Sequence, residues 1–390
     1  MAKRTRTART TSKPSRSRSP KQQGGRVRYA VVGQGYISQI AVLPAFANAR
    51  RNSELIALVS DDSQKLQVLG RRYGVDHLYG YEEFDACLAS DEVDAVFIAL
   101  PNHLHHAYTL RSARAGKHVL CEKPMAVTED ECLEMIEEAE KNRVQLMVAY
   151  RLHFEQANLK AVQIARAGRL GDLRTFNSLF CMQVEDGNIR LQAAAGGGTL
   201  YDIGIYCINA ARHLFGAEPI EVVAFAANNG EARFREVDEM TTAILRFPDD
   251  RLASFTCSFG AADVAAFDLG GTKGTLRLEN AYSFAEDMTQ RLTVGKRTTE
   301  KVYPARDQFA PELLYFSDCI LQRRKPEPSG EEGWADVRVI RALLASIESR
   351  RPVVLEPMNR RRQPSPDQEI HRPPVEEPEL VGARRPSPGD

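Results

Sequence analysis

The sequence has no continuous apolar run of about 18 residues, the length that a membrane-spanning helix needs. No apolar segment follows its basic N-terminus, so we expect no secretory signal. Its seven cysteines form no C-x-x-C pair and are odd in number, which favours reduced thiols in a cytoplasmic protein. The net charge also indicates no particular partner, because the 52 basic and 52 acidic side chains cancel. Composition therefore indicates no membrane and no polyanionic partner.

Acidic residues are absent between Lys3 and Arg28, a stretch rich in Lys, Arg, Ser and Thr. Such a stretch cannot bury enough apolar surface to fold, so residues 1–25 are predicted to be a disordered basic tail. A nucleic-acid-binding arm is the alternative, because the basic run would attract phosphates. No aromatic side chains are interleaved with the basic ones, so nucleic acid is not the expected partner. Residues 357–390, dominated by Pro, Arg and Glu, are predicted to be a second disordered tail.

The 390 residues are enough for two domains. Over residues 26–149, short apolar strands alternate with helical patterns, which predicts an α/β Rossmann domain with a doubly wound parallel sheet. Over residues 150–356, longer alternating strands predict an α+β domain with a largely antiparallel, open-faced sheet. Its strands are expected at 173–182, 220–227, 240–247 and 251–259, with shorter ones near Phe267 and Leu276. We expect helices at 200–215, 309–322 and 334–349 to cover one face, and the other face to pair subunits in a homodimer or homotetramer.

The first predicted strand ends at Gly33-Gln34-Gly35 and is followed by a helical pattern. A strand, a tight glycine turn and a helix in this order are the context of a dinucleotide site, because glycines let the backbone approach a pyrophosphate at the helix N-terminus. Ser38 stands where the third glycine of G-x-G-x-x-G would be. The fingerprint is therefore incomplete when taken alone.

The second strand ends at Ser60, roughly 25 residues beyond the glycines, about where such a domain contacts the adenine ribose. Ser60 and Lys65 suit a 2′-phosphate, whereas Asp61 and Asp62 suit the free 2′-hydroxyl of NAD. The balance predicts NADP, with NAD as the alternative.

A glycine-rich loop leads into a predicted helix that places Asp202 and Tyr206 four residues apart, on one face. A carboxylate and a phenol so placed can form a site, or they can belong to a capped, half-buried helix. The histidines at 103, 105 and 106 include no pair at i,i+4 and have no carboxylate cluster near them, so we predict no metal site.

Four motifs occur along residues 27–355: Gly33-Gln34-Gly35, Ala-Leu-Pro-Asn-His-Leu-His at 99–105, Gly-Lys-His-Val-Leu-Cys-Glu-Lys-Pro at 116–124, and Gly-Gly-Thr-Leu-Tyr-Asp-Ile-Gly at 197–204. In this order and spacing they resemble the Gfo/Idh/MocA oxidoreductases. Within that family the chain is most similar to the glucose–fructose oxidoreductases, because Tyr206 stands where many relatives carry His.

The resemblance implies an enzyme that transfers a hydride between a hydroxyl-bearing carbon of a pyranose or polyol and a nicotinamide. It implies Lys123 and Tyr206 as the catalytic pair, Asp202 as the residue that orients the sugar, and Tyr150 and Arg151 as pocket residues. It also implies a cis bond between Lys123 and Pro124. The implied cofactor contacts are Gly33, Gly35, Tyr36, Ile37, Ser60, Lys65, Leu100, Pro101, Asn102, His105, Glu122 and Lys123.

The residue types agree with that chemistry, because oxidation of a hydroxyl requires removal of its proton as the hydride leaves. An ammonium about 4 Å from a phenol, at an effective dielectric of about 20, favours the phenolate by roughly 4 kcal/mol. Two alternatives stay open. An enzyme of the glucose–fructose type would keep NADP bound with a proline-bearing N-terminal arm. The N-terminal stretch of this chain contains only two prolines, Pro14 and Pro20. A nucleotide-binding sensor or corepressor would not need the catalytic set that is present here.

Overall fold

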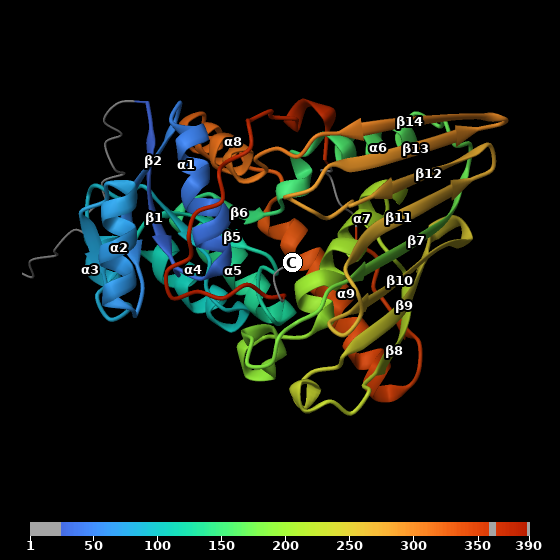
Figure 1. Ribbon diagram of the computed structural model, residues 1–390, viewed down its shortest axis with the longest axis horizontal. Coiled ribbons are helices and arrows are strands. Elements are labelled where there is room, and N and C mark those ends of the chain that lie inside the picture. The colour runs from blue at the N-terminus through green and yellow to red at the C-terminus, as the bar shows by residue number, and fades with distance from the viewer. Residues whose placement is uncertain (1–24, 359–363, 388–390) are drawn as a thin grey trace, which may run out of the picture.

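The computed structural model describes residues 25–358 and 364–387, which form two sheets with helices between and around them (Figure 1). The first sheet has six parallel strands in the order β3-β2-β1-β4-β5-β6. They are β1 Val27–Val32, β2 Ser53–Val59, β3 His77–Tyr79, β4 Ala95–Ile98, β5 His118–Glu122 and β6 Leu146–Ala149. The order reverses between β1 and β4, so the glycine turn after β1 lies at the switch point where such sheets bind ligands. The predicted doubly wound domain is confirmed.

Helices cover both faces of this sheet, and alternate residues of each strand face opposite sides. Tyr29 and Val31 pack with η1 (Ser38–Val42) and α1 (Leu43–Ala49), whereas Ala30 and Val32 belong to the core that includes the later helices. The other helices of this domain are α2 Ser63–Tyr73, α3 Phe84–Ala89, α4 His105–Arg114 and α5 Glu129–Asn142. Strand β3 and helix α3 were not predicted.

The second sheet has nine strands in the order β14-β13-β12-β11-β7-β10-β9-β8-β15. They are β7 Leu173–Cys181, β8 Glu221–Ala227, β9 Met240–Phe247, β10 Arg251–Ser258, β11 Val264–Gly271, β12 Gly274–Glu279, β13 Met288–Val294, β14 Arg297–Tyr303 and β15 Val353–Val354. Among the strands of this sheet that the structure describes, only β7 and β10 pair in parallel. The mainly antiparallel sheet is confirmed, and the predicted strands at 240–247 and 251–259 pair as the antiparallel hairpin β9–β10. Sequence reasoning missed β13, β14 and β15, and six of the seven residues of β14 are exposed, so its sequence lacks an apolar face.

The helices of the second half are α6 Gln156–Arg166, α7 Ile205–Phe215, α8 Phe309–Leu321 and α9 Gly330–Ser349. Helices α7 and α9 contact the antiparallel sheet through β7 and β8, as predicted. The prediction that the helix at 309–322 covers this sheet was wrong, because α8 packs on α1, β1 and β2 of the nucleotide domain. There the hydroxyls of Tyr29 and Ser317 lie 2.8 Å apart. Helix α8 is buried on nearly all sides, so its apolar pattern could not indicate which sheet it covers.

The C-terminal segment differs from the prediction of a disordered tail. Its described part begins beside α6 with the short helical turn η9 (Pro366–Gln368) and then lies along the nucleotide domain (Figure 1). Ile370 and Val381 pack against the core of that domain. The segment is held largely by hydrogen bonds to its backbone, which composition does not reveal. The rest of the predicted tails, at 1–24, 359–363 and 388–390, lies outside the described residues.

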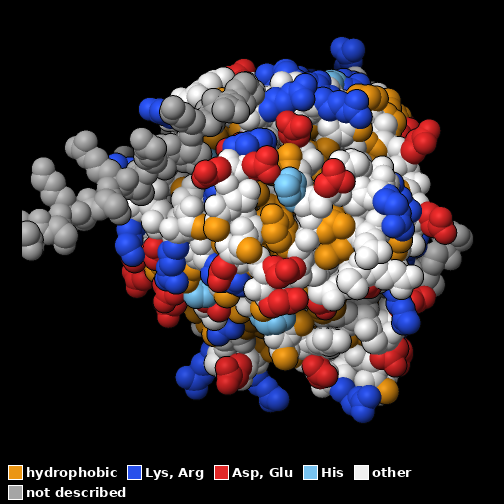
Figure 2. Space-filling view, turned by 90° about the vertical axis from the view of Figure 1, so that its left-hand side faces the viewer, with side chains coloured by type: hydrophobic (Ala, Val, Ile, Leu, Met, Phe, Trp, Pro, Cys, Tyr) orange, Lys and Arg blue, Asp and Glu red, His pale blue; other side chains and the backbone are white. Residues whose placement is uncertain are grey.

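The surface and the thiols agree with the general expectations. Figure 2 shows basic and acidic side chains interspersed over much of the outer face of the nucleotide domain. All seven cysteines are free and buried. None of the helices in the described part of the chain combines the length and hydropathy that crossing a membrane requires.

Candidate active site

The glycine turn after β1 has a shape that only glycine allows. Gly33 has a φ of 91°, and a Cβ placed on it would lie 2.4 Å from the backbone oxygen of Ala99. A Cβ on Gly35 would meet no atom within 4 Å, so the turn is open on the outer side. Ser38 fits where a third glycine was expected, because its hydroxyl donates to the Gly33 oxygen at 2.5 Å. The turn therefore fits a dinucleotide pyrophosphate, which its backbone can approach closely.

The end of β2 holds the residues that were weighed for the adenine ribose. Asp62 caps α2 by accepting from the Lys65 backbone N–H at 2.9 Å, and its other carboxylate oxygen lies 4.0 Å from the Lys65 ammonium. Ser60 is buried, and its hydroxyl accepts from the Asp62 N–H at 3.3 Å, while Asp61 is exposed. Asp62 already caps the helix and lies near the Lys65 ammonium. Its carboxylate is therefore less available to accept a hydrogen bond from a ribose 2′-hydroxyl than the sequence suggested. The roles of Ser60 and Lys65 stay predictions.

Three predicted catalytic residues come together between the two domains. Lys123 follows β5, and its Nζ donates to the Asp202 backbone oxygen at 2.8 Å and lies 3.3 Å from Asp202 Oδ1. The same Nζ lies 4.8 Å from the ring centroid of Tyr206. Asp202 belongs to the π-helical turn Leu200–Gly204, and Tyr206 to the first turn of α7. The bond between Lys123 and Pro124 is cis, as predicted.

Asp202 has a second cationic partner that sequence reasoning missed. Arg190, in the short turn η4 (Ile189–Leu191), places its Nε 2.6 Å from Asp202 Oδ2. Burial alone would raise the pKa of Asp202, but Arg190 and Lys123 together hold that pKa below its usual value. The side chain is therefore a carboxylate held between two cations. No motif surrounds Arg190, so only the fold could reveal it.

Arg151 is buried beneath Tyr206. Its Nη2 donates to the Tyr206 hydroxyl at 3.3 Å and to the Tyr282 backbone oxygen at 2.5 Å, and its Nη1 donates to Gln308. The guanidinium thus lies closer to the phenol oxygen than the prediction of a pocket-lining residue implied. Tyr150 is buried and stacks on His153, with ring centroids 5.5 Å apart. Its burial places it in the core, and its role in the pocket stays a prediction.

The loops that carry the other predicted cofactor residues are tied to one another. Asn102 donates to the Gly196 oxygen of the glycine-rich loop at 2.8 Å. The two ring nitrogens of His105 lie 2.8 Å from the backbone oxygens of Leu100 and Pro124. His105 is therefore used to hold the two motif loops together. Three further residues border these loops: Tyr36 and Ile37, half-buried after the glycine turn, and Pro101, half-buried after β4.

Two buried carboxyl groups lie near this centre. Burial raises the pKa of Glu122 to about 7, and one of its oxygens accepts from the Lys123 N–H at 3.3 Å. Glu312, in the first turn of α8, is fully buried, and burial together with Glu122 raises its pKa well above the usual value. Sequence reasoning missed Glu312, because it lies in an apolar helix that was placed against the other sheet.

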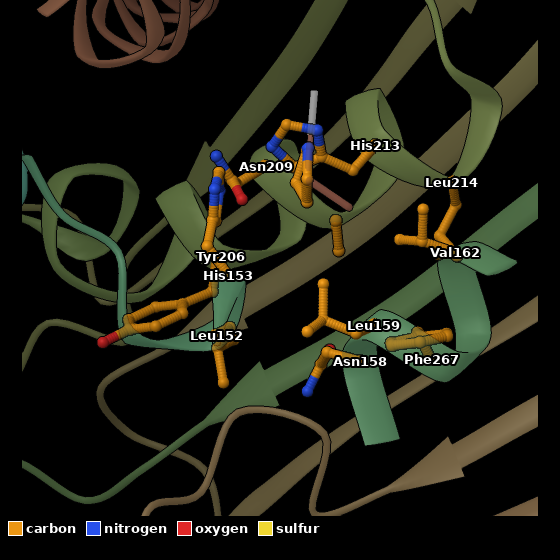
Figure 3. Close-up of a pocket in the computed structure, with 12 residues that line it drawn as sticks. Leu152, His153, Asn158, Leu159, Val162, Tyr206, Asn209, His213, Leu214 and Phe267 are labelled. Carbon is orange, nitrogen blue, oxygen red and sulfur yellow. The ribbon is translucent and has the colours of Figure 1, made fainter. Parts of the chain in front are cut away.

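A pocket that is partly open to solvent lies beside Tyr206 (Figure 3). Its apolar wall comes from α6 and α7, and its polar residues include His153, Asn209 and His213. Ligand atoms of His153, His213 and Glu332 lie within 4.8 Å of one another, a cluster that sequence reasoning missed because three separate elements supply it. Glu332 already accepts a hydrogen bond from Arg212 at 3.1 Å. The guanidinium therefore compensates the carboxylate charge that a metal ion at this cluster would otherwise neutralise.

Comparison with known proteins matches two stretches of the chain to the two domains of one family. Residues 27–150 match the family model "Oxidoreductase family, NAD-binding Rossmann fold", and residues 158–277 match the "GFO/IDH/MocA C-terminal domain". A D-xylose 1-dehydrogenase [NADP(+)] from Haloarcula marismortui is 32% identical over 85% of this chain and 93% of that protein. An uncharacterized oxidoreductase from Rhizobium meliloti is 32% identical over 83% of this chain and 97% of that protein.

Solved structures give the same result. The aldose–aldose oxidoreductase from Caulobacter crescentus, complexed with glycerol, is 37% identical with a TM-score of 0.81, over 85% of this chain and 100% of that one. A 3-ketoreductase from Actinomadura kijaniata, in complex with NADP and TDP-benzene, is 27% identical with a TM-score of 0.76, over 82% of this chain and 98% of that one.

Proposed function

Because the chain belongs to the Gfo/Idh/MocA family of oxidoreductases, we propose that it transfers a hydride between a hydroxyl-bearing carbon of a sugar and the nicotinamide of NADP. The observation that carries the proposal is the contact of Lys123 with both Asp202 and the ring of Tyr206 at the junction of the two domains. The relatives named above, a xylose dehydrogenase and an aldose–aldose oxidoreductase, support a sugar as the substrate class.

The side chains divide the work of proton removal. Burial alone would lower the pKa of Lys123, but Tyr206, Asp202 and Glu122 raise it above its usual value, so Lys123 stays an ammonium. That charge and the N–H of Arg151 lie where they stabilise an anionic Tyr206 oxygen, with which the proposed mechanism takes the proton of the sugar hydroxyl. The bound nicotinamide supplies the hydride acceptor. Asp202, fixed between its two cations, accepts a hydrogen bond from a neighbouring sugar hydroxyl.

Two versions of this activity differ in the fate of the nucleotide. A dehydrogenase would release NADPH after each turnover, as the match to a D-xylose 1-dehydrogenase [NADP(+)] supports. An enzyme that keeps the nucleotide would pass the hydride on to a second sugar, as the match to an aldose–aldose oxidoreductase supports. NADP is the proposed cofactor, since Lys65 lies in the first turn of α2, just beyond β2, and NAD is the alternative.

A panel of aldoses and inositols, assayed with NADP and with NAD, tests the proposed function. We expect reduction of NADP by at least one sugar, and a fall of at least 100-fold in kcat for Tyr206→Phe with nucleotide binding retained, because proton transfer contributes about that much. Tyr73→Phe, on the outer helix α2, is the matched control. Near-normal turnover by Tyr206→Phe would refute the proposed proton transfer to Tyr206. No turnover with any sugar, together with specific binding of a protein or DNA, would favour the sensor instead.

The proposed subunit contact is the open face of the second sheet. Strands β7, β8, β9 and β10 present large apolar side chains on that face, and Phe225 is 72% exposed and Ile244 46% exposed. Exposed apolar area of this kind marks an interaction surface. Phe225→Asp together with Ile244→Asp should convert the proposed dimer or tetramer to monomers in analytical ultracentrifugation, whereas Leu133→Asp on α5 should not. An unchanged mass for the double variant would contradict this contact.

A further inference from the structure

The C-terminal segment crosses the nucleotide domain along a defined route. It starts at the far end of α1, where Arg372 donates to the Asn48 oxygen at 3.1 Å and Asn48 donates to the Pro373 oxygen at 2.9 Å. At the far end of α2, Arg72 donates to the Glu379 oxygen at 2.7 Å. In Figure 1 this red segment passes beside α1 and then turns along the lower edge of the nucleotide domain. It therefore runs from the amino edge of the parallel sheet towards its carboxyl edge.

At the carboxyl edge the segment lies over the starts of the two helices that flank the glycine turn. The backbone of Val381 pairs with the Gln39 side chain through two hydrogen bonds, of 2.7 Å and 2.9 Å. Gly382 lies over α2, where a Cβ placed on it would be 3.2 Å from Lys65 Cε and 3.5 Å from Asp62 Oδ2. Both helix starts are the ends that bind phosphates in such folds. The segment thus covers the place where the nucleotide has to lie.

The segment then reaches the second domain. The Glu185 N–H, just beyond β7, donates to the Pro386 oxygen at 3.1 Å. Arg384 and Arg385 are exposed beside this bridge, and Arg385 pairs with Glu377 of the same segment. Burial raises the pKa of Tyr36, which follows the glycine turn, and the charge of Arg385 opposes that rise. The segment therefore carries the Arg385 guanidinium near the residue that follows the turn, and guanidinium groups are well suited to phosphate oxygens.

We propose that residues 377–387, here named the strap, form the outer wall of the dinucleotide site and hold the bound nucleotide in place. This inference rests on the proposed function, because it requires that the glycine turn binds NADP. A bound nucleotide then lies between the turn and the strap, and it leaves only after Val381 has separated from Gln39. The strap favours the version of the activity in which the nucleotide stays bound through successive turnovers.

Full-length Val381→Pro tests the strap, because proline removes the N–H that Gln39 accepts. The release of NADPH is followed by its fluorescence in a stopped-flow displacement with excess NADP. We expect release to be at least tenfold faster in Val381→Pro and in a variant that ends at Glu376. Val375→Pro is the matched control, because it extends the run Pro373-Pro374 outside the strap, and it should release NADPH at the parent rate.

The outcomes separate the two proposals. If the parent binds neither NADPH nor NADH, the proposed function fails and the strap with it. If the parent binds NADPH and neither strap variant changes its release, the strap is wrong and the proposed function stands. Tighter binding by the strap variants would show that the strap competes with the nucleotide, which also overturns the inference.

Proteolysis gives a second readout that does not depend on turnover. Trypsin can cut after Arg384, whereas the bonds after Arg372 and Arg385 precede proline and resist it. If the strap closes over a bound nucleotide, NADP should slow the cut after Arg384 in the parent at least fivefold and leave Val381→Pro unprotected. Equal cutting of the parent with and without NADP, or faster cutting with it, would overturn the proposal.

Discussion

Replacing Lys123 by methionine removes the ammonium that the mechanism requires and keeps the length of the side chain. The Nζ lies 4.8 Å from the centroid of the Tyr206 ring. An ammonium about 5 Å from a negative charge, at an effective dielectric of about 20, stabilises that charge by roughly 3.3 kcal/mol. Since about 1.4 kcal/mol corresponds to a factor of ten in rate, kcat for Lys123→Met should fall roughly 300-fold.

The fold should survive this change, because Arg190 still holds the Asp202 carboxylate at 2.6 Å. The assay is the change in absorbance of NADPH with the best sugar of the panel, at saturating sugar and nucleotide. Nucleotide binding is measured separately by fluorescence and should change only a few-fold. Lys160→Met, on the outside of α6, is the matched control and should keep kcat within about twofold. A loss of less than tenfold in Lys123→Met would refute the electrostatic role of Lys123.

Three further substitutions test other parts of the site. Asp202→Asn leaves two partly buried cations without their anion and should lower the free energy of unfolding in urea by about 1.5–3 kcal/mol; a loss below about 0.5 kcal/mol would contradict a stabilising ion pair. Gly33→Ala should abolish nucleotide binding, measured by NADPH fluorescence, because its φ of 91° and the close backbone exclude a Cβ; binding at the parent level would refute the tight turn. Glu122→Gln should stabilise the protein at pH 8 by up to roughly 3 kcal/mol and little at pH 5. Burial raises the pKa of Glu122 in the folded state to about 7 from 4.5. The protonated side chain therefore favours the folded state at low pH, and this contribution to the free energy of unfolding is lost as the pH rises through 7. Equal effects at both pH values, in urea titrations, would contradict this.

Most of the fold could be predicted because its patterns are local. The inner strands of the parallel sheet, such as β4, are buried on both faces and read as short apolar runs, and β9 alternates residue by residue because one face is covered. Strand β14 could not be predicted, since it is an edge strand whose side chains face solvent on both sides. The position of α8 was also beyond the sequence, because an all-round apolar helix fits either sheet.

The site divides in the same way. Lys123, Asp202 and Tyr206 belong to motifs, so their grouping could be expected from a resemblance. Arg190 and Glu312 reach the same centre through tertiary contacts alone, and nothing in the neighbouring sequence marks them. The C-terminal strap was misjudged for a related reason: its composition is that of a disordered chain, but specific side chains of the nucleotide domain satisfy its backbone.

The placement of α8 sets the order in which the protein is completed during synthesis. The nucleotide-binding sequence leaves the ribosome first, yet part of the cover over Tyr29 and its neighbours is made by Leu313 and Phe316, which follow the strands from β7 to β14. Until those residues emerge, the nascent domain carries an apolar face open to other nascent chains. A fragment that ends at residue 150 would keep that face permanently, so the family boundary is a poor place to divide this protein for expression.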